Sequence, residues 1–394
     1  MTDPASDATG AVRPRLSRNG IQLNGAGRIA GLDFARGLAI IGMLAAHLLW
    51  LGDDVVLADP STWSNIAAGR SSILFATLAG VSLGLMTGGR HPARGAAMGV
   101  ARRRIALRAA LLWVLGVLLI GTGVPVYVIL PAYAVLFLLA LPALTLSARV
   151  VLVLAAVLAV VMPFAQVLLD ALPFWGTPIG ESAALMIGWQ YPFPVWMAFV
   201  LAGLGIARAG LQRRSVQVGA VLAGGALAAL GYGLNAASGL AAADEWTSFG
   251  GAVWTARPHS SGLLEVIGSG GFALAVIGGC VLVCGPWWRG SVMSPAGWIV
   301  LPVRAVGAMP LSAYTAQLVI WAIAAAVILG DPSDLQGFRD LDPFWPITAV
   351  LIVAATVWAL TIGRGPLEAA TDRVTRVLVP GRADTAAETR LGPR

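Results

Sequence analysis

The chain is short of charge: its 394 residues include no lysine, and charged residues make up only 11% of it. An ordinary soluble domain carries about 25% charged residues. A chain with so little charge cannot cover a surface that faces water. Its hydrophobic residues, 58% of the total, come in long blocks, many near the ~20 residues that a helix needs to cross a bilayer. The composition therefore predicts an all-α, polytopic membrane protein.

Other absences exclude several classes of function. The two cysteines, Cys280 and Cys284, lie in one apolar run and form neither a disulfide framework nor a metal-ligand pattern. Walker loops, dinucleotide fingerprints and His-Glu-x-x-His motifs are missing, which argues against ATP-driven transport, redox chemistry and metalloprotease activity. We expect no metal. The net charge of +7 comes from arginine alone, without a basic stripe interleaved with aromatics, so we expect no nucleic acid partner.

The apolar blocks predict ten transmembrane helices between two polar tails. Residues 1–28 are expected to be a disordered cytoplasmic tail, 29–364 the membrane domain and 365–394 a polar cytoplasmic tail. The first block starts late and is too long for a signal peptide, so none is expected. The helices are predicted at residues 30–50, 70–87, 104–121, 127–146, 150–169, 192–208, 216–236, 263–285, 305–329 and 344–363.

Arginine placement predicts the orientation of these helices. The N-terminal tail and alternate loops hold arginine, as in residues 90–104 and 208–214. The intervening loops hold Asp and Glu, as in residues 53–59, 170–181 and 331–342. An excess of arginine marks the cytoplasmic side, so both termini are expected in the cytoplasm. No internal repeat is visible, which weakens an inverted-repeat transporter interpretation.

The first predicted helix carries Asp33, Arg36 and His47 in an otherwise apolar segment. Ionisable groups inside a membrane cost several kcal/mol and usually face a protein or water-filled interior. Arg36 and His47 are eleven residues apart, which places them on one helix face roughly 16 Å apart along the axis. One face thus carries a cation near the cytoplasmic end and a proton-exchanging group near the outer end. A structural explanation stays open, because Asp33 and Arg36 at i, i+3 can simply neutralise each other.

Four segments resemble one known superfamily. Residues 32–47, with the sequence Leu-Asp-Phe-Ala-Arg-Gly and the later histidine, resemble the start of the transmembrane acyltransferase superfamily. That superfamily includes the heparan-α-glucosaminide N-acetyltransferases, the YeiB-like bacterial proteins and the acyltransferase-3 proteins. Residues 69–82 and 191–208 are similar to its second and sixth segments, and residues 305–314 to the YeiB-like C-terminal region. The soluble domain fused to some acyltransferase-3 members has no counterpart here.

The resemblance implies transfer of an acyl group, usually acetyl from acetyl-CoA, to a hydroxyl or amine of a glycan or glycolipid at the outer face. It implies that His47 is the catalytic base and that Arg36, with Asp33 beside it, lies on the donor pathway. Histidine titrates near neutral pH and suits the role of base. Coenzyme A carries phosphate charges that arginine binds. Arg103 and Arg104 are further candidates for this binding, although orientation in the membrane also explains them.

Further candidates belong to the predicted outer face. His259 is one of three histidines and is a second catalytic candidate, with a solvated loop histidine as the alternative explanation. Arg70 is placed to hold an acidic acceptor or an oxyanion. Glu265 and Tyr314 are the other substrate-binding candidates, although interhelical packing explains Tyr314 equally well.

The sequence therefore favours an acyltransferase of the inner (plasma) membrane. Its expected partners are membrane lipid, acyl-CoA and an envelope glycan or glycolipid acceptor, and a homo-oligomer is left open. One rival is a proton-coupled transporter or lipid-linked flippase that uses the charges of the first helix. A non-catalytic membrane scaffold is a third alternative, which the intramembrane charges disfavour.

Overall fold

A computed structural model describes residue 23 and residues 28–52, 55–56, 58–238, 248–287 and 295–381. All regular structure in these ranges is helical, which confirms the all-α class. Most of the predicted 1–28 tail lies outside the described residues. The α-helices and the 3₁₀ helices (η) are α2 (Ala30–Leu48), η1 (Pro60–Ala67), α3 (Arg70–Met86), α4 (Gly95–Ile120), α5 (Leu130–Ala140), η2 (Pro142–Thr145), α6 (Ala148–Asp170), η3 (Pro173–Gly176), α7 (Pro178–Ile187), α8 (Phe193–Ala209), α9 (Arg214–Ser238), α10 (Phe249–Val253), α11 (Leu263–Trp287), α12 (Pro295–Ala308), α13 (Pro310–Leu329), α14 (Leu335–Asp340), α15 (Phe344–Thr361) and α16 (Pro366–Leu378).

Six of these helices are long and apolar enough to cross a membrane: α2, α6, α9, α11, α13 and α15. The number becomes seven if η1 and α3, which meet at a bend of 41°, count as one span. The protein is thus a polytopic helical membrane protein. The other predicted spans are not long and apolar enough to be counted. α5 and α8 are short, and α4 is rich in arginine.

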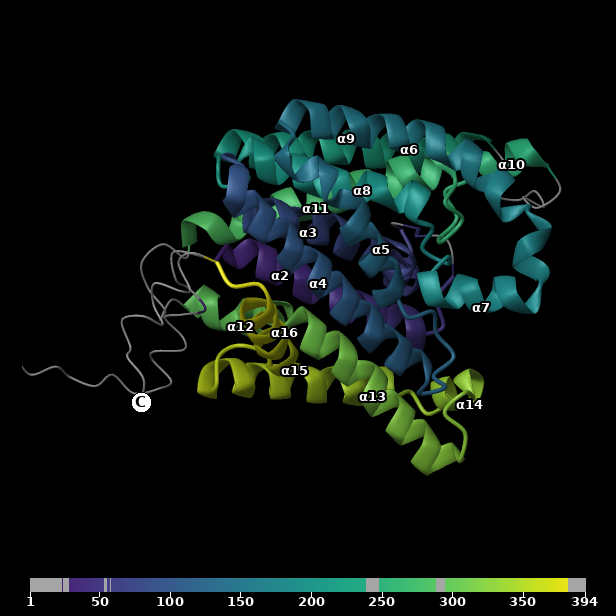
Figure 1. Cartoon of the computed structure of the whole chain (residues 1–394). Coiled ribbons are helices and arrows are strands. Elements are labelled where there is room, and N and C mark those ends of the chain that lie inside the picture. The colour runs from purple at the N-terminus through teal and green to yellow at the C-terminus, as the bar shows by residue number, and fades with distance from the viewer. Residues whose placement is uncertain are drawn as a thin grey trace, which may run out of the picture.

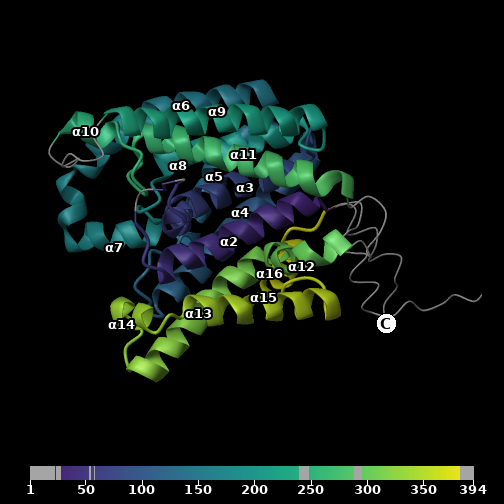
Figure 2. The same cartoon turned by 180° about the vertical axis from the view of Figure 1, so that it is seen from behind.

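The helices run side by side in three tiers (Figure 1). One tier holds α6, α8, α9 and α11, the middle tier holds α2 to α5, and the third holds α12, α13, α15 and α16. The view from behind shows the same order, with the short helices α7, α10 and α14 gathered at one end of the bundle (Figure 2). The first predicted helix, α2, therefore lies in the middle of the molecule.

Glycines let α2 pack closely against α12. A Cβ atom added at Gly37 would lie 2.1 Å from the carbonyl oxygen of Val303, and one added at Gly307 would lie 1.8 Å from that of Asp33. No side chain fits at either point. Small residues at such interfaces allow the backbones of membrane helices to approach. This contact fixes the half of α2 that carries Asp33 and Arg36.

The predicted helix 305–329 is wrong as a single element. The structure divides it into the end of α12 and all of α13, with Met309 between them at φ −132° and ψ 59°. Pro310 explains the break, because a proline disfavours helical geometry at the residue before it. Proline is well tolerated at the first position of the new helix.

The residues after Arg364 are more than the polar tail that we predicted, because they include α16. Glu368 of this helix accepts hydrogen bonds from the backbone N–H groups of Leu311 (2.7 Å) and Ser312 (3.1 Å). It thereby caps the N-terminus of α13. Its apolar residues, such as Leu367, Ala370 and Val374, do recur at helical spacing, but the segment is mostly polar and we predicted only a tail from its composition.

Two other predicted boundaries differ from the structure. α4 begins at Gly95, before the predicted residue 104, so that Arg102, Arg103 and Arg104 belong to the helix. The predicted helix 127–146 ends as an α-helix at Ala140 and continues as the 3₁₀ helix η2. Pro142 accounts for the change, since it cannot donate the hydrogen bond that an α-helix requires.

Candidate active site

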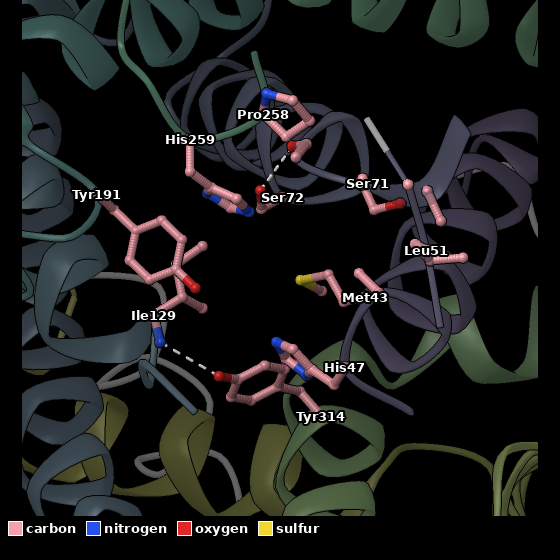
Figure 3. Close-up of a pocket in the computed structure, with 15 residues that line it drawn as sticks. Met43, His47, Leu51, Ser71, Ser72, Ile129, Tyr191, Pro258, His259 and Tyr314 are labelled. Atoms are coloured by element: carbon pink, nitrogen blue, oxygen red, sulfur yellow. Dashed lines mark hydrogen bonds between the residues drawn. The ribbon is translucent and has the colours of Figure 1, made fainter. Parts of the chain in front are cut away.

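A cavity of about 260 Å³ lies at the C-terminal end of α2. His47 of α2, Tyr191, His259 and Tyr314 face it from four distant parts of the chain (Figure 3). Ser71 and Ser72 at the start of α3 complete its polar lining. The fold therefore brings together the two histidines that the sequence singled out as catalytic candidates.

A second cavity of about 250 Å³ shares three of these side chains, those of His47, Tyr191 and His259. It extends toward α14, which contributes Arg339. The Nε of Arg339 donates to the carbonyl oxygen of His47 at 2.8 Å, and its guanidinium lies 5.1 Å from the centre of the Trp50 ring. The two cavities thus form one binding space around the histidines, with a cation on the α14 side.

The imidazole of His47 is held by packing. Its Nδ1 is buried and has no hydrogen-bond partner among the described residues. Its ring centre lies 6.2 Å from that of Trp321, which is fully buried. His47 is therefore held at the cavity wall by packing, and no hydrogen bond from a described residue fixes the protonation state of its Nδ1 atom.

His259 reaches the cavity from a strained loop that a buried carboxylate holds. His259 and Ser261 have φ angles of 64° and 56°, in the left-handed region that non-glycine residues rarely adopt. The carboxylate of Glu265 accepts from the backbone N–H of each residue at 2.7 Å, and from the hydroxyl of Ser260 at 3.2 Å. Burial lowers the pKa of His259, so its imidazole is neutral at neutral pH and able to accept a proton.

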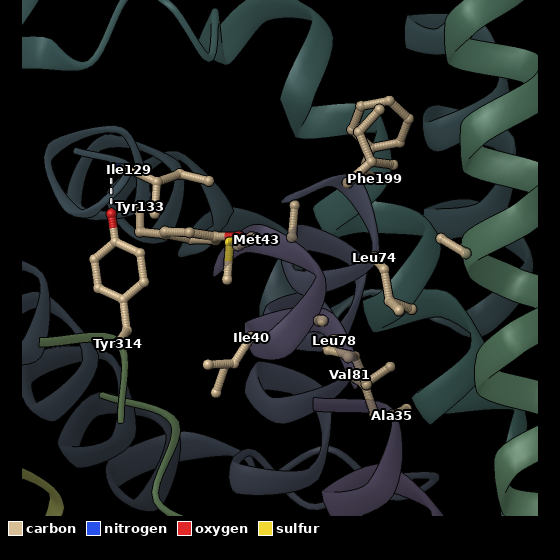
Figure 4. Close-up of a cluster of buried hydrophobic side chains, with 14 of the residues drawn as sticks. Ala35, Ile40, Met43, Leu74, Leu78, Val81, Ile129, Tyr133, Phe199 and Tyr314 are labelled. Atoms are coloured by element: carbon tan, nitrogen blue, oxygen red, sulfur yellow. Dashed lines mark hydrogen bonds between the residues drawn. The ribbon is translucent and has the colours of Figure 1, made fainter. Parts of the chain in front are cut away.

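Tyr314 connects this cavity with a narrower one of about 150 Å³. Its hydroxyl accepts from the backbone N–H of Ile129 at 3.2 Å. The narrow cavity is lined mainly by apolar side chains, together with Arg36, Ser82 and Tyr133. Figure 4 shows Tyr133 and Tyr314 beside the apolar cluster that contains Ile40 and Met43 of α2. Adjoining cavities thus extend from Arg36 to the two histidines.

Asp33 positions Arg36 and does not line any of these three cavities. Its two carboxylate oxygens accept from Arg28 and Arg36, each at 3.0 Å. The other terminal nitrogen of Arg36 donates to the hydroxyl of Ser82 at 3.0 Å. The Asp33 and Arg36 pair is therefore a real ion pair, as the neutralisation alternative proposed, yet Arg36 also faces a cavity.

The remaining predicted site residues lie elsewhere. Arg103 is exposed on α4, and the Nε of Arg104 donates to the carbonyl oxygen of Val379 at 3.0 Å. Neither lines any cavity described here. Arg70 lines a separate, larger cavity. Glu265, predicted to bind substrate, uses both carboxylate oxygens to hold the His259 loop.

Sequence reasoning missed Tyr191, Arg339 and Tyr133 as site residues. Tyr191 lies in a segment that resembles the acyltransferase superfamily, and this was an available signal. Arg339 is an arginine within an acidic loop, which is unusual on the side where positive charge is scarce. Tyr133 gives no signal, because an aromatic residue in an apolar helix is normally a packing residue.

Comparisons with known proteins place the chain in a family. No curated protein and no solved structure matches it. A family model described as the catalytic part of heparan-alpha-glucosaminide N-acetyltransferase matches residues 28–231, which is more than half of the chain. The matched part contains Arg36, His47 and Tyr191, whereas His259, Tyr314 and Arg339 follow it. The chain therefore belongs to the heparan-alpha-glucosaminide N-acetyltransferase family, a family of membrane acetyltransferases.

Proposed function

We propose that the protein transfers an acyl group, specifically acetyl, from acetyl-CoA to a hydroxyl or amine of a cell-envelope glycan or glycolipid. The observation that carries this proposal is the shared cavity of His47 and His259, which are far apart in the sequence. Family membership supports acetyl transfer as the reaction class. We infer the identity of the donor and of the acceptor from the two ends of the adjoining cavities, which extend from Arg36 to the two histidines.

The Arg36 end of that series suits the donor. A narrow apolar cavity accommodates a thin, flexible arm, and a guanidinium at its edge favours an anionic group such as phosphate. Acetyl-CoA, when bound, supplies an activated thioester. Tyr314 lies where this cavity meets the histidine cavity, so its side chain contacts the part of the donor that approaches His47.

The histidine end suits the acceptor. In a one-step transfer, His47 takes the proton of the acceptor hydroxyl or amine as that atom bonds to the acyl carbon. The carbon–sulfur bond breaks, and the proton passes to the leaving thiolate. Histidine is the side chain whose ordinary pKa suits both halves of this proton transfer. The neutral imidazole of His259 on the same cavity binds the acceptor or relays the proton.

We propose further that the Arg36 end faces the cytoplasm and that the α14 end faces outward across the inner membrane. The arginine-rich loops support this orientation, and both termini are then cytoplasmic. In a ten-span arrangement, α4, α5, α8 and the bent pair of η1 and α3 cross the membrane together with the long apolar helices.

Substitutions of His47 and His91 test the function. Without a general base the rate falls by about 10²–10⁴-fold, so we expect His47→Gln and His47→Ala to abolish acetyl transfer while the protein still inserts. His91→Gln is the matched control, because His91 is exposed on the opposite, arginine-rich side. The readout is the mass of envelope glycans and glycolipids, in which one acyl group should be lost. If acylation is unchanged and solute uptake or export stops instead, the protein is a transporter.

A further inference from the structure

A large cavity lies beside the candidate active site and is not part of it. Its volume is about 1000 Å³, against about 260 Å³ for the histidine cavity. Residues of α9, the start of α3 and the loop before α11 line it. Pro258 lines both cavities, directly before His259 in the chain. We call this space the lateral chamber.

The polar lining of the lateral chamber is cationic. Arg70 and Arg257 contribute two guanidinium groups, and among the described residues no carboxylate lines the chamber. Asn235 adds an amide whose oxygen already accepts from the backbone N–H of Ala256 at 2.9 Å, which leaves its nitrogen as a donor. Two guanidinium groups and an amide donor form a set of groups that binds an anion.

Arg70 is held in place for this role. Its Nε donates to the hydroxyl of Tyr232 at 2.8 Å, one terminal nitrogen donates to the carbonyl oxygen of Asn65 at 3.1 Å, and its guanidinium lies 4.7 Å from the Tyr232 ring centre. The other terminal nitrogen has no hydrogen-bond partner among the described residues. The nearby carboxylate of Glu265 is occupied by the His259 loop. A buried guanidinium with one uncommitted nitrogen is therefore preorganised for a ligand.

The rest of the chamber is apolar and open to the side of the bundle. Apart from Tyr232 and Asn235, its α9 wall consists of small residues, of which Ala229, Gly233 and Ala236 are exposed. Ile66 and Phe272 add larger apolar surfaces. α9 belongs to an outer tier of the bundle (Figure 1), so in a membrane this wall would lie toward the surrounding lipid. The chamber thus combines a cationic inner part with an apolar outer part at the periphery of the bundle.

We propose that the lateral chamber binds a lipid that carries a phosphate group, with the phosphate at Arg70 and Arg257 and the chains along α9. This inference rests on the proposed function in one respect: the lipid is the acceptor, and its reactive sugar passes Pro258 to reach His47 and His259. The acceptor class is then a glycolipid whose sugar is linked to the lipid through phosphate. An ordinary anionic phospholipid is the other source of the same chemistry.

Binding is tested on the full-length protein in neutral detergent. The thermal unfolding midpoint is followed while dihexanoyl phosphatidic acid, dihexanoyl phosphatidylcholine or inorganic phosphate is added, because a ligand of the folded state raises the midpoint. We expect phosphatidic acid to stabilise the protein at concentrations at which the other two have little effect. A hydrogen bond to a charged group corresponds to about 10-fold or more in affinity. Arg257→Gln should therefore raise the half-saturating concentration by at least about 10-fold.

Matched variants identify the site. Arg103→Gln removes the same charge from an exposed position away from the chamber, and it should bind like the wild type. Arg70→Gln should weaken binding like Arg257→Gln, but Arg257 is the primary variant because Arg70 also holds Asn65 and Tyr232. Equal stabilisation by phosphatidylcholine, equal binding of inorganic phosphate, or an equal loss in Arg103→Gln would each overturn the proposal.

Kinetics separate this inference from the proposed function. Phosphatidic acid should inhibit acetyl transfer competitively toward the acceptor and not toward acetyl-CoA. Binding without such competition would show that the chamber holds a structural phospholipid, and the acceptor assignment would be wrong. If the protein transfers acetyl but does not bind phosphatidic acid, lipid binding in the lateral chamber is wrong and the proposed function stands. If the wild-type protein binds phosphatidic acid but transfers no acetyl group, the proposed function is wrong and lipid binding in the chamber stands.

Discussion

Replacing Glu265 with glutamine should disable the site without touching either histidine. Glu265 accepts from the backbone N–H groups of His259 and Ser261 through different oxygens, each at 2.7 Å. Glutamine has the same shape but only one carbonyl oxygen, so it can accept only one of these bonds. Its amide nitrogen would face the other N–H group. One buried donor is then left without a partner.

The size of the effect follows from the strain in the loop. A non-glycine residue in the left-handed region costs about 1–2 kcal/mol, so His259 and Ser261 together cost roughly 2–4 kcal/mol. Hydrogen bonds to a charged group contribute about 1.5–3 kcal/mol each, so the two bonds outweigh the strain by only a small margin. Losing one removes about 2 kcal/mol, which lowers the ratio of native to open loop by about 30-fold and, given this small margin, the native fraction by roughly two- to sixfold. We expect kcat to fall by a similar factor.

Two assays test this prediction. The first compares kcat for acetyl transfer in lipid nanodiscs. Ser260→Ala is the control, because it removes the hydroxyl contacts to Glu265, Arg257 and Gly262 but keeps both backbone hydrogen bonds to the Glu265 carboxylate. The second follows diethyl pyrocarbonate labelling of His259 by mass spectrometry, which is practical because the chain has three histidines. Labelling should rise in Glu265→Gln. Wild-type kcat and unchanged labelling in a folded Glu265→Gln protein would refute the role of the carboxylate in holding the loop.

Four further predictions follow from the ion pairs and the topology. Arg36→Lys should reduce kcat/KM in the transfer assay despite keeping the charge, because a point ammonium cannot bridge Asp33 and a ligand as a planar fork does; full activity in Arg36→Ala would remove any role for this residue. Burial raises the pKa of Asp372, but hydrogen bonds from Arg376 and Arg364 and the charges of Arg364 and Arg108 outweigh it and lower that pKa overall. The ion pairs therefore stabilise the fold above the ordinary aspartate pKa, and this stability is lost as pH falls through the lowered value. Asp372→Asn should lower the free energy of unfolding by only about 1–2 kcal/mol at pH 7, since two of the arginines are more than half exposed. Below the lowered pKa of Asp372, the wild type and the variant should have the same thermal midpoint. The lowered pKa of His259 predicts that its protonation reduces kcat/KM only below pH ~6.5. A loss of kcat/KM that begins above this pH and disappears when His259 is substituted would contradict the prediction. In a protein without its two cysteines, single cysteines at positions 58 and 95 should react with an impermeant reagent from opposite sides of the membrane, and labelling from one side would exclude the proposed orientation.

The sequence predicted the part of the site that lies on one helix. Arg36 and His47 could be placed on one face of α2 because helical geometry relates nearby residues directly. The meeting of His47 with His259 and Tyr314 depends on how distant helices pack, which no local pattern encodes. The same limit applies to Arg339, which reaches the backbone of His47 from the short helix α14.

The fold was predicted well where apolar blocks are long and uninterrupted. α6, α9, α11 and α15 lie close to their predicted ranges because hydrophobic length alone defines them. The errors at 305–329 and after Arg364 have other causes. Pro310 breaks a continuous apolar block from within. α16 has a regular apolar face but is polar overall, so a search for long apolar blocks passes over it.

The cap that Glu368 forms on α13 matters for the practical handling of this protein. Pro310 and Leu311, at the capped end of α13, line the narrow cavity near Arg36. A C-terminal deletion that looks harmless from the sequence would remove Glu368 and release two backbone N–H groups beside this narrow cavity. A purification tag is therefore better joined after residue 381, where α16 stays intact. If the proposed function is right, a preparation trimmed to residue 364 should bind acetyl-CoA weakly because the cap on α13 is missing.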